Sequence, residues 1–232
     1  MTSGVLPVSI FLPFAPGATD QGQLGSCTVN AVGNAVRFAR VQARKIYAFQ
    51  PSRLFDYYNA RSERGWEGFD SGSYIRDAIK VSNKFGTIPE ERWPYDISKF
   101  TEKPPQFCYD EAANYQAISY YRLGWEADTP MALLAEMKQC LAEGWPFAFG
   151  FSVYSNFPWQ TTTGEVPMPG NGDYMLGGHA VLAVGYDDGS ARFIFTNSWG
   201  YGWGKSGRGS IPYEYLTDRG LSSDFWTIRT VE

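Results

Sequence analysis

The chain has 232 residues, of which 44% are hydrophobic and 17% aromatic, with 25 glycines and 14 prolines. This length and composition favour a loop-rich globular protein with a sizeable core over a disordered chain. The net charge is −4 and no basic stripe stands out, which argues against nucleic-acid binding. No apolar run reaches the length needed to span a membrane.

The first 16 residues are apolar, but they lack a basic start and are interrupted by prolines, so no signal peptide is predicted. We expect an extended edge or interdomain segment there. The cysteines, Cys27, Cys108 and Cys140, are odd in number and far apart, which argues against a disulfide scaffold. The localisation stays unknown, either cytoplasmic or exported without a classical signal.

The first half of the chain is predicted to be helical. Apolar residues recur three and four positions apart after Cys27, at Val29, Val32, Val36 and Ala39. A second helix is predicted after positions 51–52. A third is predicted from about 73 to 85, ending before Gly86.

A fourth helix is expected to begin at Thr129-Pro130, which suit the N-cap and the first helical position. Its inward residues are predicted to be Met131, Leu134, Met137 and Leu141. The second half then changes character, because short apolar or alternating runs are separated by Gly, Pro and Asp-Asp-Gly. These predicted antiparallel strands cover residues 147–153, 180–186, 192–197 and 225–231, with a hairpin turn at 187–190. The expected fold class is therefore α+β with two lobes.

The only histidine, His179, opens the apolar run HAVLAVGY after two glycines. Cys27 precedes it in the chain and Asn197 follows it. A thiol, an imidazole and an amide are the parts of a cysteine nucleophile, its base and the group that orients the base. Each residue alone has an ordinary structural explanation, but together with Gln21 they occur in a consistent order.

The predicted position of Cys27 at a helix N-terminus would lower the pKa of its thiol. Cys108 and Cys140 lack such a setting and are assigned to packing. If Gln21 faces the nucleophile, its side-chain N–H can join the backbone N–H of Cys27 as an oxyanion hole. Trp199 is expected to cover the bond between His179 and Asn197 from water.

These segments resemble the papain-like cysteine peptidases, in a branch of bacterial or viral type without the usual disulfides. The run DQGQLGSC at 20–27 resembles the family's loop from the oxyanion glutamine to the nucleophile. The runs GHAVLAVGY at 178–186 and NSWGYGWG at 197–204 resemble its histidine and asparagine motifs. The sequence departs from the family at Thr28, where an aromatic residue is usual, and at Leu24, where a cysteine is common.

The resemblance implies a two-lobed papain-like fold with the cleft between a helical lobe and an antiparallel β-barrel lobe. One catalytic domain spans residues 1–232, with the helical lobe at about 14–116 and the β lobe at about 117–232 plus the segment 1–13. The implied roles are nucleophile for Cys27, base and acid for His179, orienter for Asn197 and oxyanion donor for Gln21.

The segment DSGSY at 70–74 resembles the strip whose backbone pairs with extended peptide, although a turn that caps the next helix explains it equally well. Ser73 stands where a second glycine is usual. Gly177, two residues before His179, suggests a roomy pocket for the second residue before the scissile bond. The predicted substrate-binding residues are Gly72, Ser73, Gly177, Gly178 and Trp199.

The predicted function is a cysteine endopeptidase that acts through a thioester. A single histidine excludes the histidine-bearing occluding loop of some exopeptidases. The alternatives are a deamidase or transamidase with the same acyl-enzyme chemistry, and a catalytically silent peptide-binding homologue. A serine mechanism through Ser26 is disfavoured because the Gly-x-Ser-x-Gly elbow is missing there.

The expected partner is a polypeptide substrate, together with a proteinaceous inhibitor or a pro-segment. Only 20 residues precede Gln21, so the long pro-segment of many relatives is not expected within this sequence. We expect a monomer that uses no cofactor and no metal and binds neither nucleic acid nor membrane.

Overall fold

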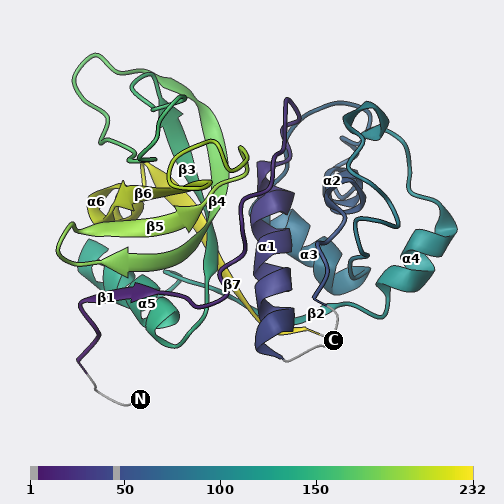
Figure 1. Ribbon diagram of the computed structural model, residues 1–232, viewed down its shortest axis with the longest axis horizontal. Helices are drawn as coiled ribbons and strands as arrows, with labels where there is room; N and C mark the ends of the chain where they lie inside the picture. The colour runs from purple at the N-terminus through teal and green to yellow at the C-terminus, as the bar shows by residue number, and fades with distance from the viewer. Residues whose placement is uncertain (1–4, 44–47, 232) are drawn as a thin grey trace.

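Helix α1 (Cys27–Gln42) stands at the junction between a group of helices and an antiparallel sheet (Figure 1). The computed structural model describes residues 5–43 and 48–231; residues 1–4 of the predicted N-terminal segment lie outside them. The other helices are α2 (Arg53–Ser62), α3 (Ile75–Lys84), the 3-10 helix η1 (Ile97–Lys99), α4 (Gln106–Ala112), α5 (Pro130–Ala142) and α6 (Tyr213–Thr217). The strands are β1 (Ser9–Phe11), β2 (Ala117–Arg122), β3 (Phe147–Tyr154), β4 (Met175–Asp187), β5 (Arg192–Thr196), β6 (Arg208–Pro212) and β7 (Ser222–Val231).

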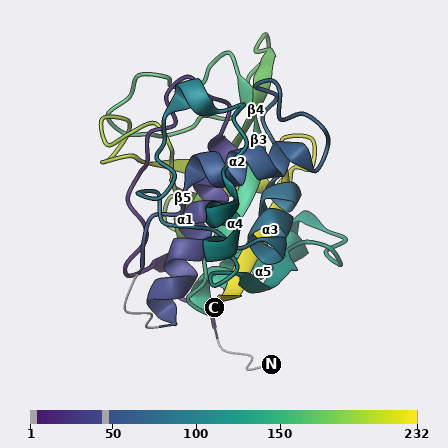
Figure 2. The ribbon, with the colours of Figure 1, turned by 90° about the vertical axis from the view of Figure 1, so that its right-hand side faces the viewer.

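Helix α1 is buried on nearly all sides because it is enclosed between the sheet and the other helices. Its predicted apolar residues, Val29, Val32, Val36 and Ala39, are each 1% exposed, and polar Asn30 and Asn34 are buried with them. A helix buried all round is typical of the interior of a larger protein. In the view turned by 90°, α2, α3 and α4 lie in front of α1 (Figure 2). Helix α1 is therefore packed between the sheet on one side and these helices on the other.

Local signals fixed the ends of several helices as predicted. The Ser52 side chain accepts a hydrogen bond from the backbone N–H of Phe55 at the start of α2, and Thr129 caps α5 in the same way. Gly86, just beyond α3, has a φ of +79°, and a Cβ there would lie 1.8 Å from the carbonyl oxygen of Ala112. Only glycine fits this position.

The inward face predicted for α5 is partly wrong. Met131 is 80% exposed, whereas Leu133, Met137, Cys140 and Leu141 are buried against the sheet. The buried face thus includes the predicted Met137 and Leu141 but adds Leu133 and Cys140, while Leu134 is only partly buried. Helix α4 and strands β2 and β6 were not predicted, although the Ile and Tyr content of Ala117–Arg122 is a usable strand signal.

The strands form an open antiparallel sheet in the order β2-β7-β3-β4-β5-β6, with β1 pairing with β4. The sheet is therefore not closed into a barrel, although the expected antiparallel strands and helices are present. At one edge of the sheet, β2 lies beside α3, where Asn83 donates from its side chain to the Ala117 carbonyl (2.8 Å). At the other edge, Ser210 of β6 bridges to Glu165.

The mixed α+β class and the extended N-terminal segment are confirmed, since β1 lies along β4 with Ile10 opposite Tyr186. A turn connects β4 to β5 as predicted, at residues 188–191, one residue later than expected. Cys108 and Cys140 are 0% and 2% exposed in the core. Within residues 5–43 and 48–231, every helix is too short or too polar to cross a bilayer.

Candidate active site

A cleft between the helices and the sheet brings the predicted site residues together. Its lining comes from the loop before α1, the first residues of α1, residues 71–75, strands β3 and β4, and residues 219–224. The predicted residues that line it are Gln21, Cys27, Gly72, Ser73, Gly177, Gly178, His179 and Trp199. Asn197 lies behind this surface and is 1% exposed.

Cys27 is the first residue of α1 and is half-buried at the surface of the cleft. The backbone N–H groups of Ala180, Thr28 and Cys27 are near the thiol and act to lower its pKa. Ala180 follows His179 on β4. This arrangement joins the start of the central helix to the histidine strand.

Burial opposes charge on both groups when each is considered alone. Burial raises the pKa of the Cys27 thiol above its ordinary value of 9.0, although the three N–H groups act in the opposite direction. Burial also lowers the pKa of His179 to about 4, against the opposing effect of its bond to Asn197. Taken separately, the two shifts favour the uncharged thiol and the uncharged imidazole.

The His179 ring is held by a hydrogen bond and by stacking. Its Nε2 lies 2.8 Å from Oδ1 of Asn197. That oxygen also accepts from the backbone N–H of Ser198 at 2.8 Å, which fixes the orientation of the amide. His179 therefore donates from Nε2, and in the neutral ring the lone pair is at Nδ1.

The indole of Trp199 stacks on the imidazole with ring centroids 4.6 Å apart and an interplanar angle of 23°. Trp199 thus covers the ring that bonds to Asn197, which is the arrangement predicted for it. On its other side Trp199 stacks on Trp159 at 5.3 Å. Trp159 is 52% exposed and lines the cleft, yet no sequence motif singled it out.

Gln21 is buried at 8% exposure beside the cleft. Its Oε1 accepts a 2.5 Å hydrogen bond from the Ser198 hydroxyl, and its Nε2 donates to the carbonyl of Leu24 at 2.9 Å. The amide is therefore oriented by two independent contacts. Ser198 was not predicted to act here, although its place directly after Asn197 in the NSWG run is a usable signal.

The segment with Gly72 and Ser73 is tied to the loop that precedes Cys27. The Asp70 carboxylate accepts from the Gly25 N–H at 3.1 Å through both oxygens, and the Ser73 hydroxyl bonds to the hydroxyl of Thr28. The N-cap of α3 is Tyr74, which makes no side-chain capping bond. Peptide binding by Gly72 and Ser73 stays a prediction.

The part of the chain that the structure describes holds no group of three or more His, Cys, Asp or Glu residues able to bind a metal ion. The cleft presents a thiol, an imidazole and neighbouring amides. A thiol that shares a cleft with an oriented imidazole is suited, once deprotonated, to attack on an acyl carbon.

The comparisons with known proteins all indicate the same family. A family model described as papain family cysteine protease matches residues 16–218. An uncharacterised peptidase C1-like protein of Acanthamoeba polyphaga mimivirus is 43% identical over 225 residues, which cover 96% of this chain and 72% of that protein. A cathepsin B-like protein of Giardia intestinalis is 31% identical over 206 residues, and the chain spans only 62% of its length.

The crystal structure of xylellain, a cysteine protease from Xylella fastidiosa, matches with a TM-score of 0.89 and 40% identity, covering 98% of this chain and 88% of that one. The Carica candamarcensis cysteine protease CMS1MS2, at 18% identity and a TM-score of 0.68, shares the fold. The chain belongs to the papain family of cysteine proteases and is a cysteine-type peptidase.

Proposed function

We propose that this protein is an endopeptidase in which Cys27 attacks the scissile carbonyl of an extended polypeptide. His179 takes the thiol proton and later gives a proton to the leaving amine, and water then hydrolyses the thioester. The observation that carries the proposal is the convergence on one cleft of the Cys27 thiol and the imidazole held by Asn197 at 2.8 Å.

Gln21 is proposed as the second donor to the oxyanion. An amide nitrogen carries two hydrogens, of which one goes to the carbonyl of Leu24. The other is available to a substrate oxygen in the cleft, alongside the backbone N–H of Cys27. Two such donors stabilise the negative charge that develops on the carbonyl oxygen.

The substrate is proposed to lie along Gly72, Ser73, Gly177 and Gly178, with Trp199 behind the histidine. A Cβ built on Gly177 or Gly178 would meet nothing within 4 Å, which supports a roomy pocket on this wall. The protein is further proposed to be a monomer whose activity is controlled by a protein inhibitor or a pro-segment.

Incubation of the protein with a mixed-sequence peptide library, followed by mass spectrometry, tests this function. Endopeptidase activity yields internal cleavages that are lost in Cys27→Ala, whose fold stays near wild type because the sulfur is half-buried. A product one mass unit heavier with an intact chain indicates deamidation instead. Unchanged peptides, together with no labelling of Cys27 by a thiol-reactive epoxide, indicate a silent binding module.

A further inference from the structure

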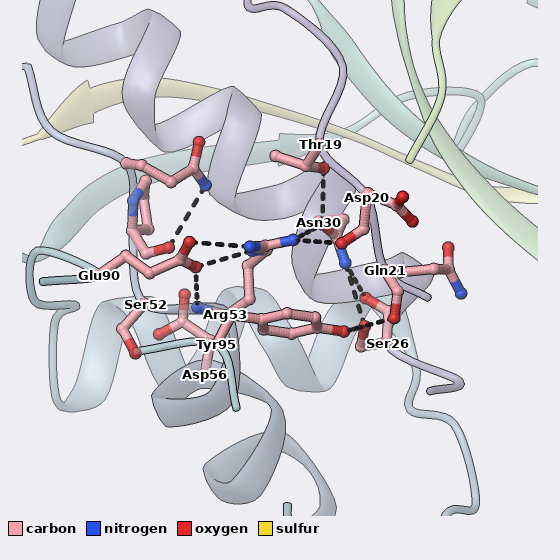
Figure 3. Close-up of polar contacts among 12 residues, drawn as sticks. Thr19, Asp20, Gln21, Ser26, Asn30, Ser52, Arg53, Asp56, Glu90 and Tyr95 are labelled. Atoms are coloured by element: carbon pink, nitrogen blue, oxygen red, sulfur yellow. Dashed lines mark hydrogen bonds and ion pairs between the residues drawn. The ribbon is translucent and has the colours of Figure 1, made fainter. Parts of the chain in front are cut away.

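A partly buried ion pair lies behind the loop that leads to the nucleophile (Figure 3). Arg53, the first residue of α2, donates from Nε and Nη2 to the two carboxylate oxygens of Glu90, at 2.7 and 2.8 Å. The Arg53 side chain is 10% exposed. Its Nη1 donates to the backbone carbonyl of Asp20 at 2.7 Å. The planar guanidinium thus fixes the backbone directly before Gln21.

The same guanidinium lies 3.7 Å from the ring centroid of Tyr95. The Tyr95 hydroxyl donates to the backbone carbonyl of Gln21 at 2.9 Å and lies 2.6 Å from the Ser26 hydroxyl. Because the phenolic hydrogen is used toward Gln21, the Ser26 hydroxyl donates to Tyr95. Burial raises the pKa of Tyr95, so the phenol keeps this hydrogen through the neutral range.

One phenol oxygen therefore joins the two ends of the loop that runs from Gln21 to Cys27. Ser26 is the N-cap residue of α1, but its side chain makes no capping bond to the helix and is turned to Tyr95 and Asn30 instead. In Figure 3 the side-chain amide of Gln21 points away from the ion pair. Tyr95 thus holds the Gln21 backbone from one side, while Ser198 and Leu24 hold its amide on the other.

We propose that Tyr95, held in place by the Arg53–Glu90 ion pair, is a positioning residue for the oxyanion hole. It acts through the backbone of Gln21 and Ser26 and touches neither the substrate nor the sulfur. The proposal rests on the proposed function, in which Gln21 and the Cys27 N–H are the oxyanion donors. Oxyanion donors lose most of their effect when they are displaced from the position of the developing charge.

The test compares reactions that need the oxyanion hole with one that does not. Tyr95→Phe keeps the ring under the guanidinium but removes the hydroxyl. Amide hydrolysis and the addition of a peptide aldehyde to Cys27 both create an oxyanion, whereas alkylation of Cys27 by iodoacetamide occurs at a tetrahedral carbon and creates none. The substrate is a coumarylamide peptide chosen from the library cleavage profile.

We expect Tyr95→Phe to lower kcat about tenfold and to raise the aldehyde inhibition constant by a similar factor, as for loss of about one hydrogen bond. KM and the rate of alkylation should stay within about twofold of the wild type. Tyr109→Phe is the matched control, because it removes a partly buried tyrosine hydroxyl that donates to Asn59 in the same group of helices, at 3.0 Å. Its kcat should not change.

A kcat for Tyr95→Phe within about twofold of the wild type would overturn the proposal. So would an alkylation rate that falls in parallel with kcat, or an equal loss of kcat in Tyr109→Phe, since either indicates a general structural role. Failure of the proposed function is distinct from these outcomes, because the wild-type protein itself would then cleave no peptide.

Discussion

The hydroxyl of Ser198 donates a 2.5 Å hydrogen bond to the side-chain oxygen of Gln21, a residue 177 positions earlier in the chain. The backbone N–H of Gln21 donates in turn to the Ser198 carbonyl at 2.8 Å. The loop before the central helix and the segment after β5 are therefore joined at the candidate oxyanion site. The same segment orients His179 through Asn197.

Removal of Gln21 should affect turnover more than binding. Gln21→Ala is expected to lower kcat by about 10²–10³, the range typical of loss of one oxyanion donor. Ser198→Ala should lower it by about tenfold, because the amide loses one of its two orienting contacts. Steady-state kinetics of the two variants and of the double variant give the measurement.

In the Gln21→Ala background, the further change Ser198→Ala should have an effect of less than about twofold, since its partner is already gone. Fully additive effects would contradict this assignment. Ser82→Ala serves as a control, because Ser82 is a buried serine whose hydroxyl bonds within α3, to the Ala78 carbonyl. Its kcat should match the wild type.

Asn197 should act through the orientation of the imidazole. Asn197→Ala is expected to lower kcat by about 10-fold to 100-fold with KM nearly unchanged, because a misplaced base lowers the rate of proton transfer. Asn59→Ala removes another buried asparagine, 4% exposed on α2, and should reduce the melting temperature without lowering kcat. A defect in KM alone for Asn197→Ala would count against the role.

The single histidine makes its titration directly visible by proton NMR, since the chain gives one imidazole signal set. In Cys27→Ser, which removes the thiolate, we expect His179 to titrate near pH 4, because burial disfavours the imidazolium. In the wild-type protein the thiolate should move this titration to higher pH. Identical midpoints in the two proteins would show that no ion pair forms.

The thiol should show the complementary behaviour when the imidazole is removed. In His179→Ala, burial of Cys27 is unopposed by a cation, so the thiol pKa should lie above 9.0. The rate of alkylation by iodoacetamide should therefore be low at pH 7 and rise only above pH 9. Rapid alkylation of this variant at pH 7 would show that the helix N-terminus suffices to form the thiolate.

Asp56 provides a prediction about stability rather than activity. It is 2% exposed on α2, its Oδ2 accepts from the Thr87 hydroxyl, and burial raises its pKa to about 8. The folded chain thus keeps a proton that the unfolded chain releases above pH 3.8. Stability should fall as pH rises from about 4 to 8, by up to about 1.4 kcal/mol per pH unit.

Asp56→Asn removes this proton release, so its melting temperature relative to the wild type should increase between pH 4 and pH 8 and then level off. For Asp96→Asn, the melting temperature relative to the wild type should instead decrease as the pH rises through the acid range. Hydrogen bonds from Ser98 lower the pKa of Asp96, so the wild type keeps its advantage above pH 4 and loses it in acid. A melting-temperature difference for Asp56→Asn that is independent of pH would exclude the buried proton.

Local sequence patterns determined the helix positions, a helix end and the order of the site motifs, because these features depend on residues close together in the chain. The apolar spacing after Cys27 predicted α1, and Gly86 ended α3 because only glycine fits its left-handed backbone beside Ala112. The order of Gln21, Cys27, His179 and Asn197 indicated the family before any coordinates. These features could be predicted because helix propensity, turn conformation and motif spacing are properties of short segments.

Only the tertiary structure decided how these segments meet. Packing in the folded chain exposes Met131 of α5 and buries Leu133. The sheet is open, with β2 beside α3 at one edge and β6 bridged to Glu165 at the other. The contact of Ser198 with Gln21 and the stack of Trp159 on Trp199 join residues from separate segments. Such contacts depend on how the whole chain packs, and the spacing of residues along the sequence does not specify them.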